Sequence, residues 1–275
     1  MLIAAPGKTP PADKRIFFIT PAARVKTVDT STRGFTSRSY EERMAEQNSK
    51  ARPQPAFLFD LDGTLIDSVY QHVLAWREAL EAEDIHLPNW YIHRRIGMSG
   101  GLIVHAFFRE AGRQLDSKEI ARLQKLHSEA FKKRVDTVRV LPGARDLLQT
   151  LSRLGVPWAV ATSGSREGAE QPLKLLGLGK DIPVITRDDV QRAKPDPDLF
   201  LAAARKLGTD LENCVVVGDS IWDLLAAQRA RALGVGLLSG GFGQDELMNA
   251  GAYRVYRDPA DLNAHLDEIG IRAGF

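Results

Sequence analysis

The sequence predicts an α/β fold, a doubly wound parallel sheet with a helical domain inserted after the first strand. Two observations indicate this fold class. From residue 56 onward, short apolar runs alternate with helix-like segments, and one interval of nearly a hundred residues interrupts the alternation. Regular alternation of strands and helices is typical of a parallel sheet that helices cover on both faces.

Six apolar runs have the length and composition of buried strands. The first five are nearly continuous in apolar residues, as expected where both faces of a sheet are covered, and the sixth is weaker. The runs are AFLFD (56–60), WAVAT (158–162), PVIT (183–186), CVVVGD (214–219), VGLL (235–238) and YRVY (253–256).

Helical segments lie between these runs. Several end in Leu-Gly, and glycine is favoured just past a helix end because it adopts the left-handed conformation there. The predicted segments are 144–155, 172–179, 196–208 and 223–234.

The long interval between the first two strands is helical in its periodicity. It contains DSVYQHVLAWREALEAEDI and SKEIARLQKLHSEAFKKRV, and LPGA (141–144) marks the return to the sheet. We expect a core built from 56–67 and 141–275, with a helical cap at 68–140. An insertion at this point creates a cleft at the carboxyl end of the first strand, where open α/β sheets bind ligands.

Residues 1–55 lack a sustained period and are rich in Pro, Ser, Thr, Arg and Lys. We expect a disordered leader. An organelle transit peptide is an alternative that the acidic pair Glu41-Glu42 weakens. A second alternative is that Met44 is the biological start, and both remain open.

Composition and charge exclude several classes of protein. The leader carries an excess of five positive charges, so the remaining residues carry a net charge of −3 although the whole chain is at +2. A nucleic-acid partner is therefore not expected. The single cysteine, Cys214, excludes a disulfide framework and a multi-cysteine metal site. No apolar stretch approaches the roughly 20 residues that a membrane helix needs. We expect a cytoplasmic protein, and its oligomeric state is open.

Polar side chains stand at or just after the predicted strand ends. In a parallel sheet these ends share one edge, so the side chains can converge. Each alone is explained by a helix cap or a turn, but their joint occurrence is harder to explain in that way. They are Asp60 and Asp62, Thr162 and Ser163, Lys194, and Asp219 with Asp223.

This group has a coherent chemical interpretation. Asp60, Asp62 and Asp219 supply the hard oxygen ligands that Mg²⁺ prefers, and the ion relieves their mutual repulsion. Thr162 and the following backbone amides can bind phosphate oxygens, and Lys194 can neutralise negative charge. Asp60 can then attack phosphorus to form an aspartyl-phosphate. Asp62 lies two residues later on the same face of the strand, so it can protonate the leaving alcohol and later activate water.

Four motifs, in order, resemble those of the haloacid dehalogenase superfamily: DLDGT (60–64), AVATSG, RAKPDPDLF and GDSIWDLLAA. The resemblance covers about 56–260 and implies a Rossmann-like core with a cap after the first strand. It implies that Asp60 is nucleophile and Mg²⁺ ligand, and that Asp62 is general acid/base and ligates through its backbone carbonyl. It further implies that Asp219 is a metal ligand that Asp223 supports, and that Thr162 and Lys194 bind phosphate. We assign four neighbouring residues to substrate binding: Gly63, Thr64, Ser163 and Gly164.

Within the superfamily the chain looks most like the phosphoglycolate phosphatase and β-phosphoglucomutase branch. Mutases of that branch typically carry an arginine soon after a Gly-x-Ser in the cap. This chain has Gly100 and Gly101 there, in RRIGMSGG, which disfavours mutase activity. Asp62 disfavours dehalogenase chemistry, because true dehalogenases lack an aspartate there. Arg94 and Arg95 are expected to bind a second anionic group of the substrate, and a solvated pair on a cap helix is the alternative.

We therefore expect a Mg²⁺-dependent phosphatase that acts on a small phosphorylated metabolite, of phosphoglycolate or sugar-phosphate type, through an aspartyl-phosphate. Three alternatives remain. One is a phosphoglucomutase-type phosphotransferase, and another is a non-catalytic phosphate-binding member of the same superfamily. The third, a response-regulator receiver, is disfavoured because receivers lack DGT and a large helical insertion.

Overall fold

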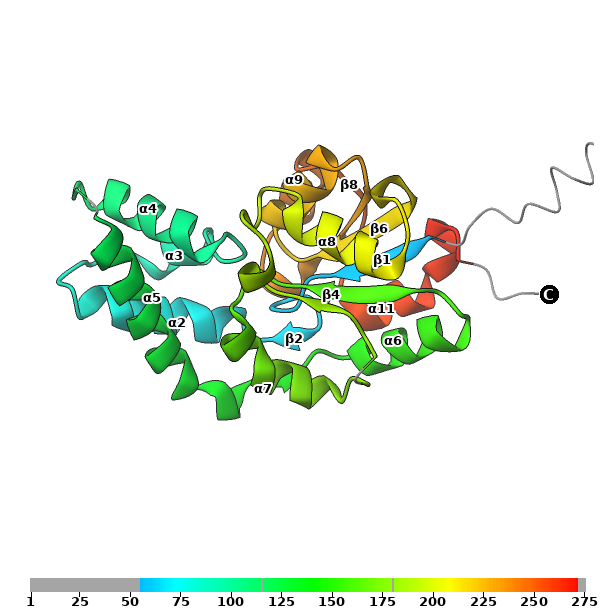
Figure 1. The fold of residues 1–275 in the computed structure, drawn as a ribbon, viewed down its shortest axis with the longest axis horizontal. Helices are drawn as coiled ribbons and strands as arrows, with labels where there is room; N and C mark the ends of the chain where they lie inside the picture. The colour runs from blue at the N-terminus through cyan, green and yellow to red at the C-terminus, as the bar shows by residue number, and fades with distance from the viewer. Residues whose placement is uncertain (1–54, 115, 180, 272–275) are drawn as a thin grey trace, which may run out of the picture. The chain divides into compact units, whose positions relative to one another are not determined.

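A six-stranded parallel sheet runs through the core, with its strands in the order β5-β4-β1-β6-β7-β8 (Figure 1). In the computed structural model, residues 55–114, 116–179 and 181–271 are described. The expectations for the leader fall outside the described residues. The strands are β1 (Ala56–Phe59), β4 (Trp158–Ala161), β5 (Val184–Ile185), β6 (Cys214–Gly218), β7 (Leu233–Leu237) and β8 (Ala252–Tyr256).

The central strand explains why AFLF is apolar throughout. Phe57 of β1 is paired in parallel with Trp158 on one side and with Val215 on the other. Phe57 and Phe59 face one side of the sheet, whereas Ala56 and Leu58 face the opposite side, and each set belongs to a separate buried cluster. Burial on both faces confirms the doubly wound α/β prediction.

Helices cover both faces of the sheet (Figure 1). On the face of Phe57 lie α6 (Ala144–Arg153), α7 (Arg166–Leu176) and α11 (Pro259–Ala264). On the face of Leu58 lie α8 (Asp198–Leu207) and α9 (Ile221–Arg229). The short helix α10 (Gln244–Asn249) packs against β8. The 3₁₀ turns are η1 (Val135–Thr137), η2 (Arg187–Asp189), η3 (Leu211–Asn213), η4 (Leu238–Gly240) and η5 (Leu266–Ile269).

Two helix predictions were wrong at their boundaries. The helix expected at 172–179 begins at Arg166, because the Ser165 side chain caps it by accepting a hydrogen bond from the amide of Gly168 (3.1 Å), and it ends before Gly177 at φ +70°. The helix expected at 223–234 ends at Arg229. Leu233 instead starts β7, where it is paired in register with Val215 of β6.

The insertion after the first strand is a set of four helices: α2 (Val69–Glu81), α3 (Asn89–His93), α4 (Gly100–Glu110) and α5 (Ser117–Lys132). Side chains from all four, including Trp76, Ile92, Phe107 and Leu123, share one buried cluster.

A short antiparallel pair joins the insertion to the core. It consists of β2 (Ile66–Asp67) and β3 (Arg139–Val140). The expectation of no strand within 68–140 was therefore wrong for its last two residues. The outgoing and returning segments run side by side and satisfy each other's backbone groups. The division into a core and a cap stays a prediction.

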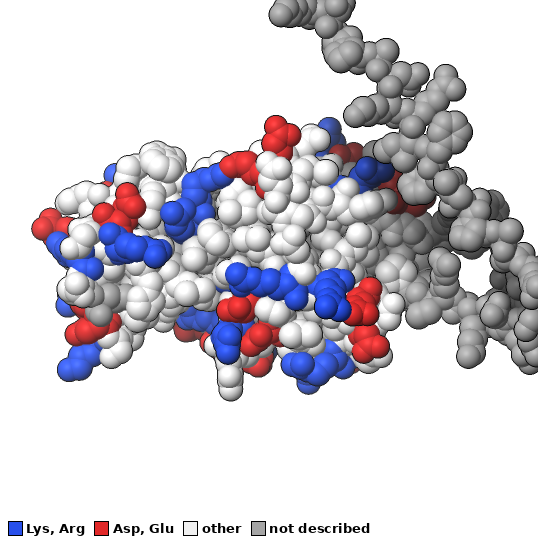
Figure 2. Space-filling model, turned by 90° about the horizontal axis from the view of Figure 1, so that it is seen from above, with Lys and Arg blue, Asp and Glu red and all other residues white. Residues whose placement is uncertain are grey.

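The surface on the face seen in Figure 2 carries interspersed acidic and basic side chains. Among the helices of the described residues, none combines the length and the apolar character needed to cross a bilayer. The cytoplasmic location and the absence of a nucleic-acid partner stay predictions.

Candidate active site

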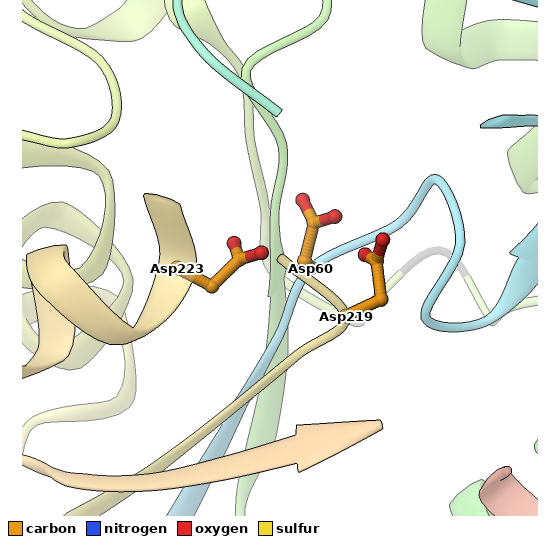
Figure 3. Close-up of side chains that lie close together, drawn as sticks. All are labelled: Asp60, Asp219 and Asp223. Carbon is orange, nitrogen blue, oxygen red and sulfur yellow. The ribbon is translucent and has the colours of Figure 1, made fainter. Parts of the chain in front are cut away.

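The chain brings three carboxylates together at the carboxyl edge of the sheet (Figure 3). Asp60 directly follows β1, Asp219 directly follows β6, and Asp223 lies in the first turn of α9. All three are buried, and one oxygen from each lies within 4.8 Å of the others. The convergence follows from the parallel sheet, whose strand ends share one edge.

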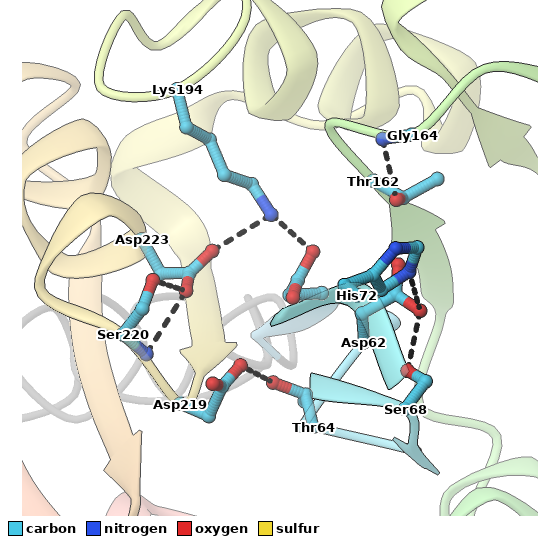
Figure 4. Close-up of polar contacts among 11 residues, drawn as sticks. Asp62, Thr64, Ser68, His72, Thr162, Gly164, Lys194, Asp219, Ser220 and Asp223 are labelled. Atoms are coloured by element: carbon cyan, nitrogen blue, oxygen red, sulfur yellow. Dashed lines mark hydrogen bonds and ion pairs between the residues drawn. The ribbon is translucent and has the colours of Figure 1, made fainter. Parts of the chain in front are cut away.

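A buried lysine sits against two of these carboxylates (Figure 4). The Lys194 ammonium forms an ion pair with Asp60 and a second one, at 2.7 Å, with Asp223 Oδ1. The other oxygen of Asp223 accepts hydrogen bonds from the hydroxyl (2.6 Å) and the amide (3.2 Å) of Ser220. Burial alone would lower the pKa of Lys194, but Asp223 and Asp60 raise it above its ordinary value, so the side chain stays charged.

The charges of this cluster do not balance without a cation. When all three buried carboxylates are ionised they face one ammonium, which leaves an excess of two negative charges. Burial raises the pKa of Asp60 to about 7 although Lys194 opposes the rise. Burial and the charges of Asp223 and Asp60 raise the pKa of Asp219 well above its usual range. A divalent ion would neutralise the excess, so this all-oxygen donor set fits Mg²⁺.

Glycines make room for the Asp219 carboxylate. A Cβ atom on Gly240 would lie 1.7 Å from Asp219 Oδ2, and one on Gly63, at φ +86°, would lie 2.5 Å from the same oxygen. Thr64 is fully buried and its hydroxyl donates to Asp219 Oδ1 at 3.0 Å. Both residues shape the carboxylate cluster and neither lines the adjacent cavity, and their assignment to substrate binding stays a prediction.

A cavity of about 370 Å³ opens beside Asp60 and Asp62. The turn after β4 forms part of its wall. Thr162 Oγ1 accepts a hydrogen bond from the amide of Gly164 (3.0 Å), so the hydroxyl proton of Thr162 is free to point elsewhere. Ser163 Oγ is buried and has no hydrogen-bond partner among the described residues. These three residues lie as expected for oxyanion binding, and that role stays a prediction.

Arg94 and Arg95 do not reach the cavity. Arg94 pairs with Glu246 and lies 4.2 Å over the ring of Phe242, whereas Arg95 lies 4.4 Å over the ring of Tyr91. The end of α3 is held against the core, where His93 Nε2 lies 2.8 Å from the Gly240 carbonyl oxygen and Trp222 Nε1 donates to the Arg94 carbonyl at 3.3 Å. Neither arginine lines the cavity, and their binding of a second anionic group of the substrate stays a prediction. Of the glycine pair that follows, only Gly100 lines it.

Asp62 is held by Ser68 and His72, two residues to which the sequence analysis assigned no role (Figure 4). Its Oδ1 accepts from Ser68 Oγ at 2.6 Å and lies 3.2 Å from His72 Nε2. Burial would raise the pKa of Asp62, but the charge and hydrogen bond of His72 and the hydrogen bond of Ser68 together lower it. The signal was present, since His72 lies three residues after Val69 and four before Trp76, both of them buried residues of α2.

Comparison with known proteins agrees with this geometry. The family model for haloacid dehalogenase-like hydrolases matches residues 55–231. Hexitol phosphatase A of Escherichia coli K12 is 36% identical over 169 residues, which cover 60% of this chain and 74% of that protein. Phosphoglycolate phosphatase of Rhodospirillum rubrum is 31% identical over 214 residues, 75% of this chain and 88% of that one.

Solved structures extend the comparison to the fold. A hydrolase from Pseudomonas syringae is 53% identical with a TM-score of 0.78, and the match covers 79% of this chain and 100% of that one. A putative β-phosphoglucomutase from Bacteroides vulgatus superposes with a TM-score of 0.70 over 84% of this chain and 94% of that one, but at 22% identity this likeness shows the fold alone. On the family match and the order of the four motifs, the chain belongs to the haloacid dehalogenase-like hydrolases.

Proposed function

We propose that this protein is a Mg²⁺-dependent phosphatase that hydrolyses a small phosphate monoester, of phosphoglycolate or sugar-phosphate type, through an aspartyl-phosphate on Asp60. One observation carries the proposal. Three buried carboxylates and one buried lysine form a cluster that has an excess of two negative charges when ionised, and one of its members, Asp60, lines a cavity of about 370 Å³. The curated relatives named as phosphatases support the same reaction class.

Asp60, Asp219 and Asp223 are the residues that would hold Mg²⁺, together with the backbone carbonyl of Asp62. The ion, when bound, supplies positive charge that offsets the charge of the phosphoryl oxygens. Thr162 and Ser163 donate hydrogen bonds to those oxygens, and Lys194 adds the remaining positive charge. Asp60 then attacks phosphorus, and the bond to the leaving alcohol breaks.

Asp62 moves the protons in both halves of the reaction. The approach of a phosphate dianion raises the pKa of a nearby carboxyl group, so Asp62 takes up a proton that it can give to the leaving alcohol. Once ionised again, it accepts a proton from the water that hydrolyses the aspartyl-phosphate. The hydrogen bonds from Ser68 and His72 fix the direction in which this carboxylate points.

The test is the release of inorganic phosphate from p-nitrophenyl phosphate and from a panel of phosphorylated metabolites, with MgCl₂ and again after chelation with EDTA. We expect release that requires Mg²⁺ and that is strongest for small esters. Absence of release from every ester, or equal release in EDTA, would contradict the proposal. Activity confined to phosphoproteins or nucleic acids would contradict the choice of small substrates.

A further inference from the structure

Arg187 reaches the cavity without a close acidic partner. Among the described residues that line the cavity, Lys132 is the other cation besides Arg187, and it pairs with Glu167 at 2.6 Å. The nearest carboxylate oxygen to Arg187 belongs to Asp188, 3.7 Å from Nε, and these side chains are 30% and 50% exposed. A loose pair at that exposure contributes little to stability. Within the described residues, this loose pair with Asp188 is the contact found between the Arg187 guanidinium group and a carboxylate.

The backbone of Arg187 is tied to the turn that we propose for phosphoryl binding. Arg187 is the first residue of η2, just past β5, and its amide donates to the Gly164 carbonyl oxygen at 3.1 Å. The amide of Gly164 in turn donates to Thr162 Oγ1. This places Arg187 beside the site of the transferred phosphoryl group.

The side chain of Arg187 extends from there toward the inserted helices. A Cβ atom on Gly100 would lie 2.5 Å from Arg187 Nη1 and 3.0 Å from Gln124 Nε2, so the guanidinium group abuts the start of α4. A cation at the first residue of a helix is disfavoured by the helix dipole. The contact between Arg187 and the start of α4 therefore gives no electrostatic reason for an arginine at position 187. An anion bound in the cavity would give one.

We propose that Arg187 binds a second anionic group of the substrate, a carboxylate or a second phosphoryl group. The inference rests on the proposed phosphatase function and deepens it, because it selects phosphate monoesters that carry another negative charge. The planar guanidinium fork matches both kinds of oxyanion in a bidentate manner. Arg187 thus takes the role that the sequence suggested for Arg94 and Arg95.

The experiment compares kcat/KM for substrates that differ in the second group. One pair is phosphoglycolate and 2-hydroxyethyl phosphate, which tests whether the second anionic group is a carboxylate. The other is fructose 1,6-bisphosphate and fructose 6-phosphate, which tests a phosphoryl group. The variants are Arg187→Gln and Arg187→Lys, with Arg166→Gln as the matched control. Arg166 pairs with Asp189 at 2.7 Å outside the cavity, so its loss removes the same charge without touching the proposed contact.

We expect the wild type to prefer the anionic member of at least one pair, and Arg187→Gln to reduce that preference about 10- to 100-fold, as loss of a charged hydrogen bond does. In Arg187→Gln the member of each pair that lacks the second anionic group should lose less kcat/KM than the member that carries it, and Arg166→Gln should keep the preference. Arg187→Lys should fall between the wild type and Arg187→Gln, because it keeps the charge but loses the fork.

The possible failures are distinguishable. If the wild type releases no phosphate from any ester, the proposed function fails and the inference with it. If it hydrolyses p-nitrophenyl phosphate but shows no preference within either pair, only the inference is overturned. An equal loss toward both members of a pair in Arg187→Gln, with an unchanged melting temperature, also overturns it. Should Arg187→Gln not fold, Arg187→Lys decides, and an unchanged preference in that variant counts against the inference.

Discussion

The ring of His72 bridges Asp62 and a second histidine, His127, whose Nε2 lies 3.1 Å from His72 Nδ1. His72 belongs to α2 and His127 to α5, so the contact joins two helices of the insertion to the carboxylate beside the cavity. Both rings are stacked on aromatic neighbours, His72 on Phe131 and His127 on Trp76. If His72 donates to Asp62 through Nε2–H while neutral, His127 must donate to the bare Nδ1.

This chain of contacts predicts an effect of His127 on catalysis. Replacing His127→Phe keeps the stacking but removes the hydrogen-bond partner that orients His72, so Asp62 loses part of its positioning. We expect kcat to fall about tenfold with a small change in KM, as modest misplacement of a catalytic group does. Steady-state kinetics on p-nitrophenyl phosphate measures it, with His86→Gln, an exposed histidine, as the control. An unchanged kcat in His127→Phe would show that the contact does not orient Asp62.

His127 also predicts a pH dependence of stability. Burial, followed by the positive charges of His72 and Arg187, holds the pKa of His127 well below its ordinary value of 6.5, while Asp62 opposes this. The unfolded chain then binds a proton near pH 6.5 that the folded chain does not. The contribution of neutral His127 to the free energy of unfolding is fully present above pH 6.5. It is lost as the pH falls below 6.5, at up to about 1.4 kcal/mol per pH unit.

Urea denaturation between pH 5.5 and 7.5 checks this expectation. The free energy of unfolding should decline less steeply toward pH 5.5 in His127→Gln than in the wild type. Parallel curves for the two proteins would show that His127 does not titrate differently in the folded and unfolded states.

Residues at strand ends could be located from the sequence, whereas residues whose direction depends on tertiary packing could not. Asp60, Thr162 and Asp219 were placed correctly because each directly follows a parallel strand, and strand ends of one sheet share an edge. Arg94 could not be placed in the same way, since its direction depends on how α3 docks against Gly240. Arg187 also lies just after a strand, but its position in the sequence does not mark it as a cavity residue. The contact of its side chain with Gly100 in the structure does.

The excess of negative charge predicts that Mg²⁺ stabilises the folded chain. Binding to the folded state alone contributes about 2.7 kcal/mol at an ion concentration 100 times the dissociation constant. The melting temperature of the wild type should therefore rise on addition of MgCl₂, relative to NaCl at equal ionic strength. Asp219→Asn removes one ligand and should reduce the rise, whereas Asp67→Asn, an exposed aspartate on β2, should retain it. An equal rise in melting temperature in all three proteins would show that the ion does not bind at Asp219.

Replacement of the two aspartates of the DLDGT motif should impair turnover in different ways. Asp60→Asn should abolish turnover, because an amide neither attacks phosphorus nor offers an anionic oxygen to a metal. Asp62→Asn keeps the backbone carbonyl that we expect to ligate Mg²⁺, but it cannot transfer protons. Loss of general acid/base catalysis typically slows a reaction about 10²- to 10⁴-fold, so this variant should turn over slowly and accumulate phosphoenzyme. Single-turnover kinetics with a labelled phosphate donor, followed by mapping of the label, measures both effects. The label should be found on Asp60 in Asp62→Asn and be absent from Asp60→Asn, and a label on any other residue would refute the proposed nucleophile.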